Sequence, residues 1–315
     1  APTESSTPVP TAYITHPSCL KHNMGDWHPE SPERLRAIDD RLHAAHLFDF
    51  LTHLDAIRAD RSQLLRVHDA DYIDTLEAAS PSEGFHALDP DTTMNPHTLN
   101  AALHAAGGAV MAGDRVMRGE VANAFVACRP PGHHATRNQA MGFCFFNNVA
   151  VAAAHALEAH GLERVAIVDF DVHHGNGTEA IFTDDPRVML CSTFQHPFYP
   201  YCGADTASEH IVNVPLPAGT TGPAYREAFT AQIMPRLEAH RPQMLFCSAG
   251  FDGHREDDMA QFGLVEADYI WITEQVMEVA ARHAEGRIVS LLEGGYDLSS
   301  LGRSVAAHIK TLAAL

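Results

Sequence analysis

The chain has 315 residues and a formal net charge of −19. Its 45% hydrophobic and 19% charged residues are ordinary for a soluble globular protein able to bury one large core. The acidic balance argues against nucleic acid as a partner, because nucleic-acid-binding surfaces are basic. Apolar runs stay short of the roughly 20 residues that a membrane span requires, so we expect no membrane partner. The six cysteines are scattered without a CxxC pair, which favours a reducing, cytoplasmic location.

The first eleven residues, APTESSTPVPT, are polar and contain proline. They carry neither the basic residues nor the apolar segment of a secretory signal, and we expect residues 1–11 to form a flexible tail. Whether a signal peptide was removed before residue 1 is left open. No repeat or long linker divides the remainder, so residues 12–315 are expected to form one domain.

Apolar runs that predict strands alternate with amphipathic stretches that predict helices. The predicted strands are Ala12–His16, Ala122–Cys128, Val165–Val172, Val188–Phe194, Gln243–Ser248 and Ile288–Leu292. The predicted helices are Glu33–Phe48, Leu99–Arg118, Val149–His160, Tyr225–His240, Glu266–Ala284 and Leu298–Leu315. Continuous apolar strands joined by helices are typical of a parallel sheet covered on both faces. Ligands of such sheets bind beyond the carboxyl ends of the strands.

The stretch AIVDFDVHHGNG places polar side chains at the end of a predicted strand. Asp169, Asp171 and His173 are two residues apart, so strand alternation would point them to one face. A third candidate ligand, Asp252, ends another strand in SAGFDGH. Three protein ligands leave an open position, as in catalytic metal sites. The alternative is that Asp171 and His173 only pair with each other and that Asp252 caps a helix.

Other unusual residues follow the remaining strands. RPPGHHA places His133 and His134 after a rigid turn, where a neutral imidazole suits a general base, although histidines in a His-rich chain are often bystanders. Asp169 is expected to orient a neighbouring histidine, or else to be satisfied by backbone amides. Tyr296 follows two glycines in EGGYD, which predicts either an oxyanion donor or a packing residue.

Two aromatic segments, MGFCFFNN and HPFYPY, follow strands that end at the same rim. Phe143, Phe198 and Tyr199 are expected to wall a narrow apolar tube, although each such residue is more often part of a core.

Together, RPPGHHA, GFCFFNN, VDFDVHHGNGTEAIF, SAGFD and EGGYD resemble the histone deacetylase family in order and spacing. The resemblance runs from about Pro29 to near the C-terminus, and Asn176 is similar to class II and bacterial acetoin-utilisation-type members. It implies an α/β, single-domain, three-layer arginase/deacetylase fold with a parallel eight-stranded sheet between helices. The implied activity is hydrolysis of the amide of N-ε-acyl-lysine, releasing acetate or another short acyl group.

The resemblance also implies roles for individual residues. Three residues would hold Zn²⁺, with Fe²⁺ as another metal suited to these donors: Asp171, His173 and Asp252. Five residues would be catalytic: His133, His134, Asp169, Asn176 and Tyr296. Among them, His134 would act as general base and acid with support from Asn176. His133 would pair with Asp169, and Tyr296 would polarise the substrate carbonyl.

Further residues match the family's substrate channel and cation sites. The channel set is Gly142, Phe143, Phe198, Tyr199 and Met259, where Tyr199 replaces a more usual phenylalanine and makes the mouth more polar. Arg34 matches the arginine of an internal acetate-exit channel. A structural K⁺ would have an inner set of Asp169, Asp171, His173, Ser192 and Thr193. A second K⁺ would have an outer set of Phe182, Asp185 and Val188.

Three alternatives remain open at this stage. An acetylpolyamine amidohydrolase would act on a small acetylated amine; polyamine-selective relatives carry glutamate where Met259 stands, but the acidic residues 256–258 keep this reading open. An arginase-like ureohydrolase needs a second metal and more aspartate ligands. A non-catalytic acyl-lysine-binding or metal-binding protein would lack a ligand, the base or the tyrosine. The sequence leaves open whether the chain forms a homo-oligomer.

Overall fold

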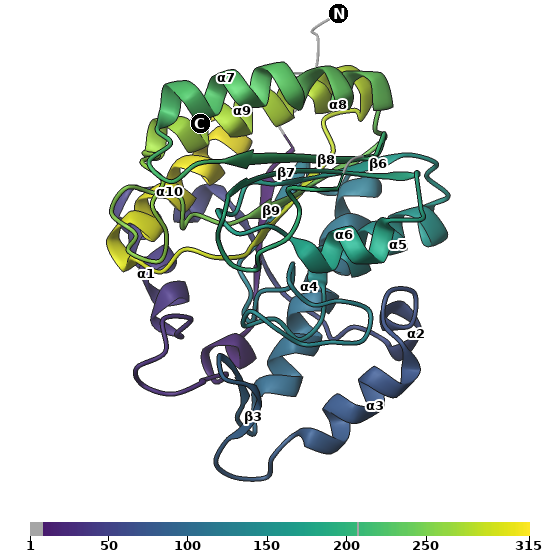
Figure 1. Ribbon diagram of the computed structural model, residues 1–315, viewed down its shortest axis with the longest axis vertical. Coiled ribbons are helices and arrows are strands. Elements are labelled where there is room, and N and C mark those ends of the chain that lie inside the picture. Colours follow the sequence, from purple (N-terminus) through teal and green to yellow (C-terminus); the bar gives the residue numbers. More distant parts are fainter. Residues whose placement is uncertain (1–8, 207) are drawn as a thin grey trace, which may run out of the picture.

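The computed structural model describes residues 9–206 and 208–315. Its main sheet has eight parallel strands in the order β2-β1-β5-β10-β9-β6-β7-β8 (Figure 1). Their bounds are β1 Thr11–Thr15, β2 Thr52–Asp55, β5 Asn123–Val126, β6 Val165–Asp169, β7 Val188–Gln195, β8 Ile211–Leu216, β9 Leu245–Ala249 and β10 Ile288–Leu292. The central strands are buried along their whole length, because helices cover both faces of the sheet. The predicted α/β fold with an eight-stranded parallel sheet between helices is confirmed.

Helices form the two outer layers (Figure 1). On one face lie α4 (Thr98–Met117), α5 (Asn148–His160) and α6 (Asn176–Phe182). On the other lie α1 (Glu33–Ala44), α7 (Gly222–Gln232), α8 (Met234–His240), α9 (Glu266–His283) and α10 (Leu298–Leu312). None of the helices in the described part of the chain combines the length and apolarity needed to cross a membrane.

Smaller elements complete the fold. Two short 3-10 helices span Pro17–Leu20 and Phe48–Phe50, and two further helices are α2 (Arg61–Leu64) and α3 (Ala70–Ala79). Strands β3 (His86–Asp89) and β4 (Thr92–Met94) form a separate antiparallel hairpin. Asp91, in the turn of this hairpin, lines a cavity of about 230 Å³.

Several predicted boundaries were wrong. The predicted helix Tyr225–His240 is two helices, because Pro235 in the first turn of α8 has no N–H to continue α7. Residues 1–8 of the predicted tail lie outside the described residues, and Thr11 is buried as the first residue of β1. Edge strands β2 and β8 were not predicted. Strand β2 consists mostly of polar residues, and Pro215 interrupts the apolar residues of β8.

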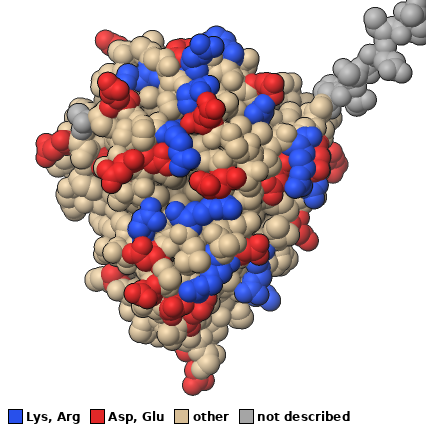
Figure 2. Space-filling view, turned by 90° about the vertical axis from the view of Figure 1, so that its right-hand side faces the viewer, with Lys and Arg blue, Asp and Glu red and all other residues tan. Residues whose placement is uncertain are grey.

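The molecule carries charge of both signs on its surface. On the face shown in Figure 2, basic and acidic side chains are interspersed. The net charge of −19 is therefore not separated into single-sign regions on that face, and short-range pairing between neighbours limits its repulsive cost.

His308 is a buried polar residue in the layer between β10 and α9. Its Nδ1 lies 2.7 Å from Thr273 Oγ1 and its Nε2 2.7 Å from Ser290 Oγ. The rings of Phe125 and Phe251 pack edge-on against it. Burial lowers the pKa of His308 to about 3, so the imidazole is neutral in the folded protein at neutral pH.

Acidification should therefore destabilise the protein through His308. An unfolded histidine has a pKa of about 6.5, so between about pH 6.5 and pH 3 the unfolded chain binds more protons and stability falls as pH falls. This group alone contributes a slope of up to about 1.4 kcal/mol per pH unit. Urea unfolding at pH 7 and pH 5.5 should show a larger loss for wild type than for His308→Gln. Equal losses in the two proteins would contradict the assignment.

Candidate active site

The turn after β6 gathers the polar residues that the sequence singled out. Strand β6 ends at Asp169, so Asp171 and His173 lie beyond it, and the predicted strand to Val172 was wrong. Asp169 Oδ1 accepts the Asp171 N–H at 3.2 Å, and Asp171 Oδ1 accepts the His173 N–H at 2.8 Å. Side-chain hydrogen bonds to the backbone, rather than the pleat of a strand, thus orient these residues.

Asp171, His173 and Asp252 form a buried cluster whose ligand atoms lie within 4.8 Å of one another. Nδ1 of His173 is 3.0 Å from Asp252 Oδ2 and 3.2 Å from Asp171 Oδ1. Two carboxylates and one imidazole suit a divalent ion such as Zn²⁺ or Fe²⁺. Burial and the charge of Asp171 raise the pKa of Asp252, and a bound cation would neutralise this pair. These residues therefore fit a metal ion.

Backbone donors hold the two carboxylates from outside the cluster. The Gly294 N–H donates to Asp171 Oδ2 at 2.9 Å, and the Val172 N–H donates to Asp252 Oδ1 at 3.1 Å. A Cβ at Gly294 would lie 2.4 Å from Asp252 Oδ2. Only glycine allows the backbone to approach both carboxylates this closely.

Two neighbouring histidines face different partners and differ in charge. Nδ1 of His133 is 2.8 Å from Asp169 Oδ2. Burial opposes a charge on His133, but Asp169 and Asp171 outweigh it and raise its pKa well above the ordinary value. For His134, burial and then the charge of His133 lower the pKa well below the ordinary value. Their surroundings thus shift the pKa values of the two imidazoles in opposite directions.

Asn176, the first residue of α6, fixes the tautomer of His134. Its Nδ2 donates to Met141 Sδ at 3.4 Å, which leaves Oδ1 to accept from His134 Nδ1, 2.8 Å away. His134 therefore carries its proton on Nδ1, and its Nε2 lone pair is free.

A cavity of about 230 Å³ opens above the metal-ligand cluster. Its lining residues are Asp91, His134, Gly142, Phe143, His173, Phe198, Tyr199, Met259 and Tyr296. All five residues predicted for the substrate channel are among them. The Phe198 ring stacks on His173 at 5.2 Å, and Phe143 packs edge-on against Tyr296 at 5.9 Å. The cavity is therefore a channel with aromatic walls, and the polar side chains of His134, His173 and Tyr296 line it as well.

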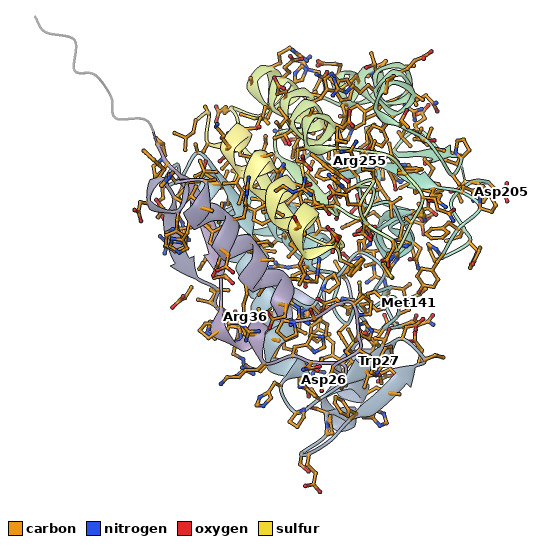
Figure 3. The ribbon with its side chains drawn as sticks, turned by 90° about the vertical axis from the view of Figure 1, so that its left-hand side faces the viewer. Asp26, Trp27, Arg36, Met141, Asp205 and Arg255 are labelled. Atoms are coloured by element: carbon orange, nitrogen blue, oxygen red, sulfur yellow. The ribbon has the colours of Figure 1, made fainter. Side chains whose placement is uncertain are left out.

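Gly142 lies where the channel wall touches His134. Its φ is +56°, and a Cβ there would lie 2.5 Å from His134 Cδ2. A side chain at this position would displace the imidazole. Met141, labelled in Figure 3, directly precedes Gly142 in the chain. Trp27, also labelled there, is 75% exposed and directly precedes His28, whose ring packs on Phe143.

Arg34 lies directly behind Tyr296. Its fully buried guanidinium donates from Nε to Gly295 O at 2.7 Å, from Nη1 to Glu30 Oε2 at 2.8 Å and from Nη2 to Glu293 O at 2.6 Å. The guanidinium carbon lies 5.0 Å from the centre of the Tyr296 ring. Arg34 thus supports the loop that carries the phenol.

The two predicted K⁺ sets differ in their free acceptors. The inner set lies where Asp169 of β6 is aligned with Ser192 of β7, and Ser192 Oγ is buried without a partner among the described residues, so this set fits a cation. In the outer set, Phe182 O already accepts the Asp185 N–H at 3.0 Å and lies 3.0 Å from His210 Nε2. Phe182 O is thus already hydrogen-bonded at least once, whereas Ser192 Oγ is not, and the outer set stays a prediction.

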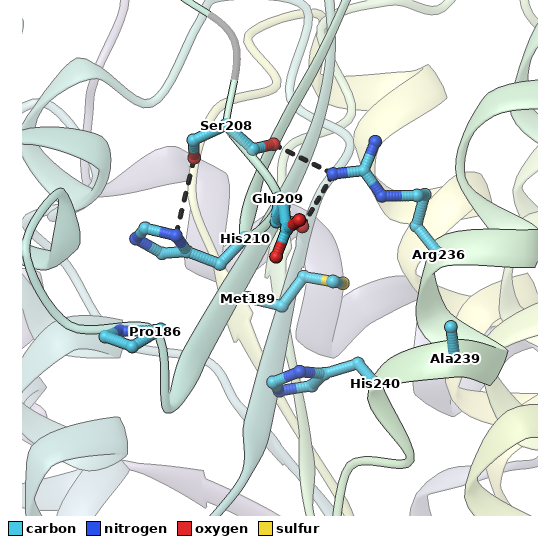
Figure 4. Close-up of a pocket in the computed structure, with 8 residues that line it drawn as sticks. All are labelled: Pro186, Met189, Ser208, Glu209, His210, Arg236, Ala239 and His240. Carbon is cyan, nitrogen blue, oxygen red and sulfur yellow. Dashed lines mark hydrogen bonds between the residues drawn. The ribbon is translucent and has the colours of Figure 1, made fainter.

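A larger cavity, of about 770 Å³, lies near the amino ends of β7 and β8 (Figure 4). Arg236 Nη2 donates to the carbonyls of Ser208 and Glu209 there, at 2.8 and 2.6 Å. None of the predicted site residues lines this cavity. Because ligands of parallel sheets bind at the carboxyl ends of the strands, size alone does not mark the active site.

The structure places three further residues at the site, and the sequence analysis named only one of them, Asp257, as part of the acidic run 256–258. Asp91 lines the channel from the β3–β4 hairpin, which was not predicted, although DPD is a turn signal. Glu293 Oε1 accepts the N–H groups of Gly132 and His133 at 2.8 and 3.2 Å, while its Oε2 has no described partner. Asp257 contacts the Tyr296 loop. The last two act through long-range contacts, for which the sequence holds no local signal.

Comparisons with known proteins agree with this geometry. The family model of the histone deacetylase domain matches residues 28–312. The chain is 39% identical to the histone deacetylase-like amidohydrolase of Pseudomonas aeruginosa, over 89% of this chain and 77% of that protein. It is 38% identical to the polyamine deacetylase HDAC10 of Mus musculus, over 90% of this chain and 44% of the mouse protein.

The fold comparison leads to the same family. The crystal structure of the HDA15 HD domain is similar with a TM-score of 0.92 and 34% identity, covering 97% of this chain and 88% of that one. The family model matches nearly the whole chain, and its motif residues converge on one channel. The chain belongs to the histone deacetylase family of amidohydrolases.

Proposed function

We propose that this protein is a metal-dependent deacylase that hydrolyses the amide of N-ε-acyl-lysine in proteins or peptides. The observation that carries this proposal is the aromatic-walled channel of about 230 Å³ that ends at His134, His173 and Tyr296. A lysine side chain is unbranched and apolar along its methylenes, so it fits a narrow channel of this kind. The polar groups at its end then meet the acyl amide.

The histidines divide the proton chemistry. A bound divalent ion would polarise the amide carbonyl and acidify the attacking water. His134 is neutral with a free Nε2, so it removes a proton from that water and later protonates the departing amine. His133, paired with Asp169, supplies fixed positive charge beside it.

Tyr296 supplies the remaining donor. Burial and the nearby charge of Asp252 raise its pKa well above the ordinary value, so the phenol keeps its proton. It can therefore donate a hydrogen bond to the oxyanion that develops on the substrate carbonyl.

The proposal includes finer assignments. Asp171, His173 and Asp252 would hold Zn²⁺ or Fe²⁺, and the unpartnered Ser192 Oγ supports one structural K⁺ in the inner set. Arg34 would line an acetate-exit channel behind Tyr296. Asn176 supports a class II-like assignment, and the scattered free cysteines support a cytoplasmic location.

A polyamine deacetylase is the second candidate, because the chain is similar to a mouse protein of that name. The channel residue Asp91 supports it, since a carboxylate at the mouth suits a distant ammonium. Met259 opposes it, because this channel residue is apolar. An arginase-like reaction would require a second metal beside the first, and no second group of ligand-type residues in the described chain lines the channel.

Asp252→Ala should abolish both tight metal binding and amidase activity, because one of three ligands is lost. Metal content per chain by mass spectrometry and turnover of an acetyl-lysine peptide are the measurements. Asp40→Ala is the control, since Asp40 is exposed on α1 and belongs to none of the ligand-type clusters of the described residues. A fully active Asp252→Ala protein with one metal ion would remove Asp252 from the site.

Tyr296→Phe should lower kcat by about 10² to 10³, the usual cost of one oxyanion donor. Metal content and thermal stability should barely change, because the ring is kept. A hydroxamate inhibitor should lose affinity only modestly, since the metal anchors it. Retention of more than about a tenth of the wild-type kcat would assign Tyr296 to packing instead.

Met259→Glu should shift the ratio of kcat/KM from acyl-lysine peptides toward N8-acetylspermidine, because a carboxylate would meet the distant ammonium of the polyamine. Met259→Gln, of similar size but uncharged, is the control. Both substrates are assayed on the same metal-replete preparations. If Met259→Glu leaves the ratio unchanged, selectivity is set elsewhere, for example by Asp91 or residues 256–258.

A further inference from the structure

Asp257 joins the two loops that bring Tyr296 and Met259 to the channel. Its Oδ2 accepts the Tyr296 N–H at 2.7 Å and the Asp297 N–H at 3.3 Å. Its Oδ1 accepts the Met259 N–H at 2.9 Å. One carboxylate therefore ties the segment after the ligand Asp252 to the loop of the proposed oxyanion donor.

The peptide bond between Gly295 and Tyr296 is held at both ends. Its carbonyl oxygen accepts from Arg34 Nε at 2.7 Å, and its N–H donates to Asp257 Oδ2 at 2.7 Å. Charge-assisted hydrogen bonds are shorter and stronger than neutral ones. Opposite buried charges on the two sides thus fix the plane of this peptide, and with it the direction in which the Tyr296 side chain leaves the backbone.

Asp257 has no cationic partner to explain its burial. Its exposed fraction is 4%, and within the described ranges no arginine, lysine or histidine forms an ion pair with it. Burial and the charge of Asp252 raise its pKa to about 6. Burying a carboxylate costs free energy, and here backbone N–H groups alone offset that cost.

The geometry points to Asp257 as a positioning residue that, opposite Arg34, aims the Tyr296 phenol at the reacting carbonyl. This role rests on the proposed function of Tyr296 as oxyanion donor. Small displacements of a catalytic group cost rate steeply, so the effect of Asp257 is expected in kcat rather than in KM.

Asp257→Asn tests this role with little change of volume. The asparagine keeps one acceptor oxygen, but its NH₂ must face at least one of the three N–H groups, so the hold on the loop is broken in part. We expect kcat to fall at least about tenfold, with KM, metal content and thermal midpoint close to wild type. Asp268→Asn is the control for a buried carboxylate away from the channel: Asp268 is also 4% exposed and accepts the Val265 N–H at 2.9 Å at the start of α9, and it differs from Asp257 in pairing with Arg226. It should leave kcat unchanged.

A double-mutant cycle with Tyr296→Phe separates positioning from a general structural effect. If Asp257 acts through the phenol, Asp257→Asn causes no further loss of kcat in the Tyr296→Phe background. Losses that multiply in the double variant would overturn the inference.

A second readout does not need turnover. The Kd of a hydroxamate for Tyr296→Phe, divided by its Kd for wild type, measures what the phenol contributes to binding. The same ratio, taken between the double variant and Asp257→Asn, should be smaller. An unchanged ratio would overturn the positioning role. Absence of wild-type turnover on any acyl-lysine peptide would instead reject the proposed function, while the inhibitor cycle still decides the role of Asp257.

Discussion

The burial of Asp171 and Asp252 side by side is the constraint on which the site depends. Two carboxylates removed from water are unfavourable unless donors or cations compensate them. Here the N–H groups of Val172 and Gly294 and the His173 imidazole converge on them. That convergence requires β6, β9 and β10 to end at the same edge of the sheet, and parallel pairing of these three adjacent strands provides it.

A neighbouring buried carboxylate, Asp169, sets the two histidines apart. His133 faces Asp169 and so favours its charged form, and its charge then helps to keep His134 neutral. Adjacent residues of one turn thus acquire pKa values shifted in opposite directions by their surroundings alone, as the proposed division of roles between them requires. Glu293, which accepts the N–H of His133, holds the backbone of this turn in place.

The sequence predicted most of what lies at the strand ends, because burial leaves a local pattern there. An aspartate in an apolar run, such as Asp171, stands out, and the strand-end rule for parallel sheets then collects such residues into one site. The reason given for their orientation was wrong, since Asp171 and His173 follow the strand. Edge strand β8 is interrupted by Pro215, Asp91 lies in a short hairpin without an apolar run, and Asp257 contacts residues some forty positions away, so no local pattern reveals their place in the structure.

Most of the channel wall belongs to other loops than the candidate metal cluster at the channel floor. The cluster follows β6 and β9, whereas Asp91, Phe143 and Phe198 come from three other loops, and Met259 shares the segment after β9 with Asp252. Loops tolerate sequence change better than the elements they connect. The binding preference can therefore drift in evolution, or be recombined in a laboratory library, one loop at a time while the hydrolytic centre is inherited intact.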